Sequence, residues 1–131
     1  MRDFRKLIAW QKAHRMAVEV HAAAEDMHST AAPGLRAQLL RSASSVPANL
    51  AEGCGKRTEF EFARYIDIAL GSSRELQNHL LFARDVGCLD EAIAEQLAGA
   101  ADEVQRILYS LARSVRRRSG LSGIPEDSPK L

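Results

Sequence analysis

Residues 9–27, AWQKAHRMAVEVHAAAEDM, place apolar side chains alternately four and three residues apart. A repeat of about 3.6 residues puts them on one face of an α-helix, and the alternating steps are typical of the seam between helices in a bundle. We therefore expect a helix from about residue 7 to residue 28, ending at the turn sequence STAAPG of residues 29–34. The expected seam residues are Ala9, Ala13, Met16, Val20, Ala23 and Met27.

Three further segments repeat this period, and turn or capping residues separate them. The second helix should end at Gly53–Cys54–Gly55. Pro47 inside it lacks an N–H and should kink it, although tertiary packing could keep the apolar pattern continuous. Thr58 and Glu61 form a capping box that starts the third helix, and Asp90 caps the fourth. The expected core residues are Leu35, Leu39, Ala43, Val46, Leu50 and Cys54 in the second helix, Phe62, Ile66, Ala69, Ser73, Leu76, Leu80 and Ala83 in the third, and Ile93, Leu97, Ala100, Val104, Leu108, Leu111 and Val115 in the fourth.

The composition also favours helices. The 131 residues include 21 alanines and 15 leucines, whereas aromatic residues make up 5%. Small and unbranched apolar side chains favour helices over sheets. Because short turns join the expected helices, neighbouring helices must run antiparallel, and we predict an all-α, up-down-up-down four-helix bundle in residues 1–118. Residues 119–131 contain Gly, Ser and Pro with little to bury, and we expect a disordered tail there.

Membrane, secreted and zinc-binding classes do not fit the sequence. No apolar run approaches the roughly 20 residues of a membrane-spanning helix, and the first residues, MRDFRK, lack the apolar stretch of a secretory signal. Cys54 and Cys88 lie 34 positions apart without a C-x-x-C motif, so we interpret them as buried thiols. We expect a soluble, cytoplasmic protein.

Charges are separated along the expected bundle, although the formal net charge is only +1. The predicted connectivity brings residues 1–15, 50–64 and 106–118 to one end, where 13 basic and four acidic side chains give a net charge of +9. The remaining helical residues, 16–49 and 65–105, carry four basic and 11 acidic side chains, a net charge of −7. One end of the bundle should therefore be strongly basic.

This basic end is a candidate site for phosphates. The arginines that end the fourth helix suit its dipole, but cations near the start of the first and third helices do not, because a helix N-terminus disfavours positive charge. Arginine and lysine match the phosphates of RNA or DNA, whereas a solvated charged end explains the same residues without a ligand. The candidate nucleic-acid-binding residues are Arg5, Lys6, Lys12, Lys56, Arg57, Arg113, Arg116, Arg117 and Arg118.

A polar stripe lies beside the apolar face of the second helix and consists of Gln38, Arg41, Ser45, Asn49 and Glu52. In the antiparallel register, Arg41 lies near the level of Gly71, with Asp67 and Glu75 one turn to either side, so the register allows an ion pair between the helices. The small residues Gly71–Ser73 should let a neighbouring helix approach closely, despite a glycine cost of about 1 kcal/mol. We interpret the stripe as a hydrogen-bonded network between helices or subunits rather than as an active site.

The sequence contains no arrangement typical of an enzyme. His14, His21 and His28 recur every seven residues, which separates neighbours by roughly 10 Å along a helix, too far to share one metal ion. Di-iron bundles use two E-x-x-H motifs, and the chain has one, at residues 25–28. Motifs of hydrolases, P-loops and dinucleotide-binding sites are missing, as are an RNA-recognition motif, a zinc finger and a set of stacking aromatic residues. We expect no catalytic residue, metal or cofactor.

Several segments together resemble a bacterial family of four-helix bundle proteins first named for proteins encoded in intervening sequences of 23S rRNA genes. The resemblance extends from about residue 4 to residue 118, and its most specific segment is SVPANLAEG at residues 45–53. The weaker segments are WQKA at 10–13, LLRSA at 39–43, ALGSSREL at 69–76 and ARDVG at 83–87. The candidate structural and interface residues are Arg41 from the polar stripe and, from the matching motifs, Ser45, Pro47, Asn49, Glu52, Gly53, Gly71, Ser72 and Glu75.

The resemblance implies a homo-oligomer, with pentamers favoured, whose bundles assemble side by side around a central channel. The family is similar in fold to accessory proteins of diversity-generating retroelements, which form positively charged barrels and associate with nucleic acid and a reverse transcriptase. That similarity concerns the fold, and it makes this chain neither a retroelement protein nor a ribosomal component. It implies no catalytic residues.

Three hypotheses about function follow from the sequence. The leading one is a non-enzymatic, cytoplasmic, ring-forming bundle that binds RNA or DNA without sequence preference through its basic end. The second is a scaffold that binds a protein partner and no nucleic acid. The third is a metal-dependent bundle enzyme.

Overall fold

The computed structural model describes residues 2–27 and 32–120 and contains four long helices. A short 3-10 helix, η1 (Phe4–Lys6), precedes α1 (Ile8–Glu25). The other helices are α2 (Leu35–Cys54), α3 (Glu59–Asp85) and α4 (Glu91–Arg118). In the described part of the chain there is no strand. The predicted tail lies outside the described residues except for residues 119–120.

The helix boundaries follow the capping residues that the sequence predicts. Thr58 Oγ1 accepts a hydrogen bond from the Glu61 backbone N–H at 3.1 Å at the start of α3. Asp90 does the same for Ile93 at the start of α4, also at 3.1 Å. The Glu61 side chain reaches back to the Thr58 hydroxyl, whose proton its Oε1 accepts at 3.1 Å. The first helix ends at Glu25, three residues before the expected position.

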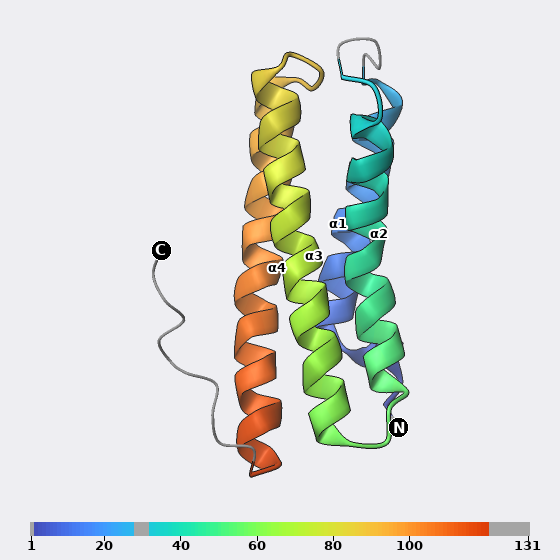
Figure 1. Ribbon diagram of the computed structural model, residues 1–131, viewed down its shortest axis with the longest axis vertical. Coiled ribbons are helices and arrows are strands. Elements are labelled where there is room, and N and C mark those ends of the chain that lie inside the picture. The colour runs from blue at the N-terminus through green and yellow to red at the C-terminus, as the bar shows by residue number, and fades with distance from the viewer. Residues whose placement is uncertain (1, 28–31, 121–131) are drawn as a thin grey trace.

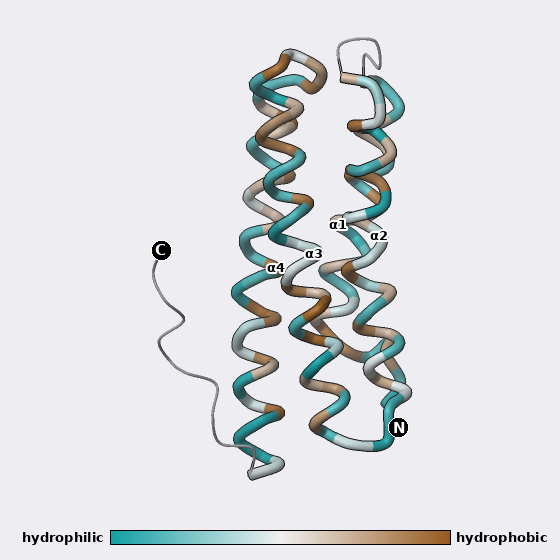
Figure 2. Tube along the Cα trace, viewed as in Figure 1, coloured by the Kyte–Doolittle hydropathy of each residue, from teal (hydrophilic) through white to brown (hydrophobic). Residues whose placement is uncertain are grey.

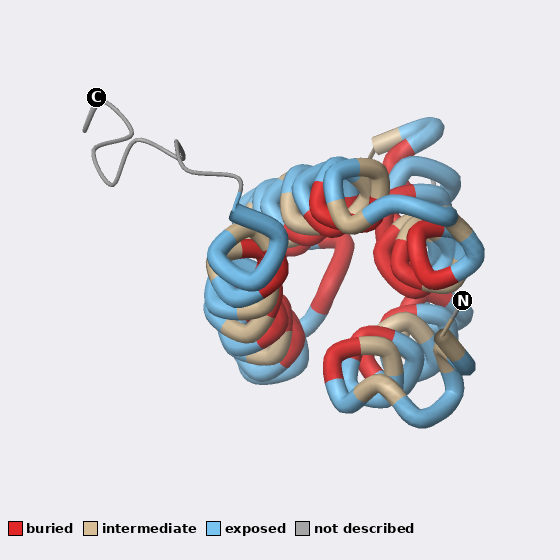
Figure 3. Tube along the Cα trace, turned by 90° about the horizontal axis from the view of Figure 1, so that it is seen from below, coloured by how far each residue is buried: buried red, intermediate tan, exposed pale blue. Residues whose placement is uncertain are grey.

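The four helices form an up-down-up-down bundle, as the sequence predicts. Each helix packs against the next along the chain, and α1 also packs against α4, which closes the arrangement. Figure 1 shows the start of α1, the end of α2, the start of α3 and the end of α4 at the lower end of the molecule. Viewed from below in Figure 3, the buried residues face the space that the four helices enclose.

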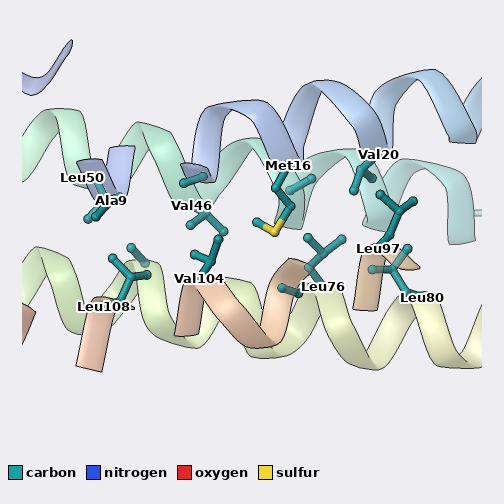
Figure 4. Close-up of a cluster of buried hydrophobic side chains, with 14 of the residues drawn as sticks. Ala9, Met16, Val20, Val46, Leu50, Leu76, Leu80, Leu97, Val104 and Leu108 are labelled. Carbon is teal, nitrogen blue, oxygen red and sulfur yellow. The ribbon is translucent and has the colours of Figure 1, made fainter. Parts of the chain in front are cut away.

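One apolar core runs along the bundle. Polar and apolar residues alternate along each helix in Figure 2. Buried apolar residues of all four helices belong to a single cluster. Figure 4 shows side chains from all four helices pointing toward one another, among them Met16, Val46, Leu76 and Leu108. All four side chains are at most 1% exposed. Burying a side chain of this size contributes about 1.5 to 3 kcal/mol relative to leaving it in water.

The predicted core is confirmed in full for α2 and α3 and in part for α1 and α4. Every expected residue of the two central helices is buried. In α1, Ala24 is buried and Ala23 is half-buried. Met27, which lies after the end of the helix, is also half-buried. The prediction for Ile93 is wrong, because this side chain is exposed and Ala94 takes the inward position. The remaining differences in α4 are that Ala100 and Leu111 are half-buried, and that Ala98, Ala101, Gln105 and Ala112 are buried.

Pro47 lies inside α2, and the helix continues through it without a break. The proline ring is buried between Val46 and Leu50, both of which belong to the core. A proline inside a helix removes one backbone hydrogen bond, and packing against neighbouring helices can compensate for that loss. The helix therefore keeps its apolar period on both sides of Pro47.

Candidate nucleic-acid interface

Four segments of the chain meet at the lower end of the bundle in Figure 1, and Glu59 links them. Glu59, the first residue of α3, pairs with Arg2 from the N-terminal segment, and its Oε2 lies 4.0 Å from Arg118 Nη2 at the end of α4. The Arg2 backbone N–H donates to the carbonyl oxygen of Cys54, the last residue of α2, at 3.0 Å. The predicted meeting of these segments at one end is thus confirmed.

A close contact between α2 and α3 supports this end. A Cβ added at Gly53 would lie 2.7 Å from Tyr65 Cβ and 3.2 Å from Phe62 Cδ1, so only glycine allows the two helices to come this near. Phe62 is buried, and the Arg2 guanidinium lies 4.2 Å from the centre of its ring. Gly53, which the family resemblance assigned to packing, therefore has a specific packing role.

We name the cluster of cations at this end the basic pole. The structure leaves four of its side chains exposed and outside any ion pair within residues 2–27 and 32–120, namely Lys6, Arg57, Arg64 and Arg117. Lys56 is half-buried, and its Nζ lies 5.1 Å from the centre of the Tyr65 ring. The basic pole consists of Lys6, Lys56, Arg57, Arg64, Arg117 and Arg118.

Two of the predicted cations are already matched by carboxylates near the pole. Arg5 Nε lies 3.0 Å from Asp3 Oδ1, and this hydrogen bond holds the pKa of Asp3 below its ordinary value. Arg116 pairs with Asp67 of α3, and only 22% of its side chain is exposed. Arg113 is half-buried. These three residues offer less free charge to a ligand than the basic pole does.

Lys12 lies apart from the other predicted cations. Its Nζ is 2.6 Å from Glu103 Oε1, and this contact lowers the pKa of Glu103. Glu103 precedes Arg118 by 15 residues on α4, roughly 22 Å along the helix axis. The prediction placed Lys12 at the basic end because it lies near the start of its helix. Since α1 has 18 residues and α4 has 28, the start of α1 does not reach the level at which α4 ends.

Two residues of this region were not singled out from the sequence. Arg64 follows Phe60 by four residues on α3, so the two side chains share one face of the helix. Phe60 is 62% exposed, although Phe62 two positions later is 1% exposed. The sequence does contain a signal for this exposed pair. The capping box at Thr58 fixes where the helix starts, and the core-facing residues begin at Phe62, so the spacing places Phe60 and Arg64 away from the core.

The polar stripe of α2 joins α3 in a hydrogen-bonded network. Ser45 Oγ and Ser72 Oγ lie 2.8 Å apart, and Asn49 Nδ2 donates to Ser45 Oγ at 3.0 Å. Tyr65 Oη donates to Glu52 Oε1 at 3.3 Å. The predicted packing roles of Ser45, Asn49, Glu52 and Ser72 within one subunit are consistent with these contacts.

The ion pair expected from the helix register is present. Arg41 of α2 pairs with Glu75 of α3, and His79 Nε2 lies 3.1 Å from Glu75 Oε2 on the other side. Burial raises the pKa of Glu75, but the hydrogen bonds with His79 and Arg41 outweigh it, so the pKa lies below its ordinary value of 4.5. Gln38 Oε1 accepts from Arg41 Nη2 at 2.9 Å.

Gly71 does not let another helix of the same bundle approach, contrary to the expectation. Gly71 is exposed, and a Cβ added there would meet nothing within 4 Å. Its neighbour Ser73 is the residue that contacts α4, because its hydroxyl donates to the Ala101 carbonyl oxygen at 3.0 Å. Within one subunit, Gly53 therefore makes the close approach that was expected of Gly71.

The described residues contain no metal-ligating group. Among residues 2–27 and 32–120, no three or more His, Cys, Asp or Glu side chains are arranged to hold a metal ion. His14 stacks on Trp10 with ring centres 4.7 Å apart, and His28 lies outside the described residues. Cys54 and Cys88 are free and buried, and burial raises the pKa of the Cys54 thiol.

These observations define an all-α, four-helix bundle with a cluster of exposed cations at one end. No helix in the described part of the chain has the length and apolar character needed to span a membrane. A model of the 23S rRNA-intervening sequence protein family matches residues 5–110, and the chain belongs to this family. The resemblance drawn from the sequence motifs is thereby confirmed.

The fold is also similar to that of a protein of unknown function from the S23 ribosomal protein family of Bacteroides thetaiotaomicron, which is known from a crystal structure. The match has a TM-score of 0.75 and 20% sequence identity, and it covers 81% of this chain and 99% of that chain. At this level of identity the similarity concerns the fold. Comparison with curated proteins found no match.

Proposed function

We propose that this chain is a non-enzymatic, cytoplasmic protein that binds RNA or DNA through the basic pole, without sequence preference. One observation carries the proposal: Lys6, Arg57, Arg64 and Arg117 come from three separate segments, yet all are exposed at the same end and lack an ion pair among the described residues. Phosphate binding of this kind is governed by the number of cations that replace counterions.

The pole is held in place before any ligand arrives. Arg2 and Arg118 both approach Glu59, so this carboxylate is already matched by cations. The contact of Gly53 with Tyr65 fixes the loop that carries Lys56 and Arg57 relative to α3. A backbone that is already ordered loses little conformational freedom on binding, which favours association with a polyanion.

Fluorescence anisotropy with an RNA hairpin tests the proposal. We expect Arg57→Gln combined with Arg117→Gln to weaken binding by about 10-fold and to reduce the slope of log Kd against log salt by roughly two units. Arg36→Gln is the matched control, because Arg36 is an exposed arginine at the opposite end of α2. Equal effects of the two variants, or unchanged binding by the double variant, would contradict a role for the basic pole.

The second part of the proposal is that several bundles assemble side by side into a homo-oligomeric ring, with a pentamer favoured by the family resemblance. Support comes from the outer face of α3, which carries the exposed side chains Ile68 and Phe82 with Gly71 between them. Glycine in a helix interior costs about 1 kcal/mol, and here no neighbour within the subunit accounts for it. A second copy packed against this face would cover the exposed apolar side chains and could approach closely at Gly71.

Native mass measurement of two lysine variants tests the assembly. Ile68 and Ile93 are each 42% exposed, but Ile93 lies on α4 rather than on the outer face of α3. We expect Ile68→Lys to reduce the mass to that of smaller species and Ile93→Lys to leave it unchanged. A monomeric wild-type protein, or an Ile68→Lys variant that assembles normally, would contradict the proposal.

The second candidate function is a scaffold for a protein partner. A groove of about 650 Å³ at the upper end of the bundle favours it, because Leu35, Phe82 and Val86 give the groove an apolar lining. Affinity purification with and without nuclease distinguishes the two functions. Material that nuclease removes indicates nucleic acid, and a protein that remains after nuclease treatment indicates the scaffold.

A further inference from the structure

Phe60 is the most exposed of the large apolar side chains at the lower end of α3, with 62% of its surface accessible. It lies in the first turn of α3, three residues after Arg57 and four residues before Arg64. On a helix, residues four apart lie one above the other, so Phe60 and Arg64 are neighbours on the surface. An exposed aromatic ring thus shares a helix face with one exposed arginine, and a second exposed arginine precedes it in the sequence by three residues.

The carboxylates next to Phe60 are directed to other partners. Glu59 pairs with Arg2 and lies 4.0 Å from Arg118. Glu61 accepts a hydrogen bond from the Thr58 hydroxyl at 3.1 Å. The positive end of the α3 dipole also lies in this turn, which favours an anion there. Of the two carboxylates beside Phe60, Glu59 is therefore compensated by cations, whereas Glu61 keeps its negative charge and bonds a neutral hydroxyl.

We propose that Phe60 is a stacking platform for an unpaired base, and that Arg57 and Arg64 bind the phosphates on either side of that base. This inference rests on the proposed function and narrows the ligand to single-stranded RNA or DNA. Aromatic rings accept any base, because every base has a π face, so stacking adds affinity without adding sequence preference. In a duplex the bases are already stacked on one another, so they are not free to stack on the Phe60 ring. Only the phosphates of a duplex can contact this surface.

Tyr65 and Phe62, the other aromatic residues at the start of α3, do not compete for the role. Tyr65 is half-buried, with its ring against Lys56 and its hydroxyl 3.3 Å from Glu52. Phe62 is buried beneath Arg2. Ile93 is 42% exposed near the start of α4, away from the basic pole and from the proposed subunit face, and therefore provides the control.

The experiment compares a short unstructured RNA with the same strand annealed to its complement, by fluorescence anisotropy at fixed salt. We expect Phe60→Ala to weaken binding of the single strand by about 5- to 100-fold and to change binding of the duplex by less than about twofold. Phe60→Trp should restore single-strand binding, and Ile93→Ala should leave both affinities unchanged. The salt dependence of Phe60→Ala should match that of the wild type, because no phosphate contact is lost.

Three results would overturn the inference. The first is that Phe60→Ala binds the single strand as tightly as the wild type, and the second is that it weakens binding of the single strand and of the duplex equally. The third is that it lowers the native mass, which would make Phe60 a subunit contact. These results leave the proposed function intact as long as the Arg57→Gln, Arg117→Gln variant still loses affinity. A wild-type protein that binds neither ligand would overturn both the inference and the proposed function.

Discussion

The two ends of the bundle carry charge of opposite sign, and what differs is how many of their cations remain unpaired. At the upper end, Asp90 and Glu91 lie at the N-terminus of α4, where a negative charge is favoured, and Arg84 at the end of α3 pairs with Asp85. At the lower end, Glu59 and Glu61 lie in the first turn of α3 and three arginines in the last turn of α4, so the helix dipoles are matched there as well. The lower end is distinguished by the four exposed cations that have no ion pair among the described residues, and binding to phosphates provides an explanation for them.

The largest expected effect separates the two phenylalanines of the lower end. Phe62→Ala should lower the free energy of unfolding by about 3 to 5 kcal/mol, because it opens a cavity beneath Arg2 and beside Gly53. Phe60→Ala should change the same quantity by no more than about 0.5 kcal/mol, because its ring is exposed. Urea denaturation measures both values. Similar losses for the two variants would mean that Phe60 is part of the fold rather than of the ligand surface.

The next largest effect on stability distinguishes the glycines by the space around them. Gly53→Ala should destabilise the protein by about 1 to 3 kcal/mol, because the new Cβ would overlap Tyr65 Cβ. Gly71→Ala and Gly99→Ala should each stabilise the subunit by about 0.5 to 1 kcal/mol, because nothing lies within 4 Å of the added atom. Thermal unfolding at a protein concentration low enough to dissociate any oligomer gives the comparison. A neutral Gly53→Ala would show that α2 and α3 can separate without cost at this end.

The smallest effect concerns the ion pair between α2 and α3. Because the folded state holds the pKa of Glu75 below 4.5, this carboxylate stabilises the fold at neutral pH, and that contribution disappears as the pH falls through its folded pKa. Glu75→Gln should therefore cost about 0.2 to 1 kcal/mol at neutral pH, and progressively less as the pH is lowered below 4.5. Urea midpoints across this range measure the difference.

Glu19→Gln is the control for that prediction, because Glu19 is exposed on α1 and has no ion pair among the described residues. Its effect should be small. A Glu75→Gln variant whose loss of stability persists at low pH would show that packing, rather than the charge, explains the effect of the substitution.

The sequence predicts the fold best in those helices whose large apolar residues all lie on one face. In α2 and α3, large residues such as Leu39, Leu50, Ile66 and Leu80 repeat at a single phase, and every predicted core position is buried. In α4, alanines occupy several neighbouring phases, so Ile93 was assigned to the core although Ala94 is the buried residue. A small apolar side chain fits either face, and only packing against α3 determines which one is buried.

The candidate site is predictable from topology but not from local charge. Alternating helices bring the segments that carry most of the predicted cations to one end (Figure 1), whereas Lys12 lies away from it. Which cations remain unpaired depends on partners far apart in the sequence, such as Asp67 for Arg116 and Glu103 for Lys12. The length of α1 relative to α4 decides where Lys12 lies, and sequence periodicity does not give that offset.

Hydrogen–deuterium exchange with and without a short unstructured RNA tests most directly whether nucleic acid binds at the basic pole. We predict slower exchange on RNA addition in residues 2–6, 55–64 and 113–120, and no change at the opposite end in residues 84–95. Protection at the opposite end, or no protection at the basic pole under conditions where RNA is bound, would contradict binding at the basic pole.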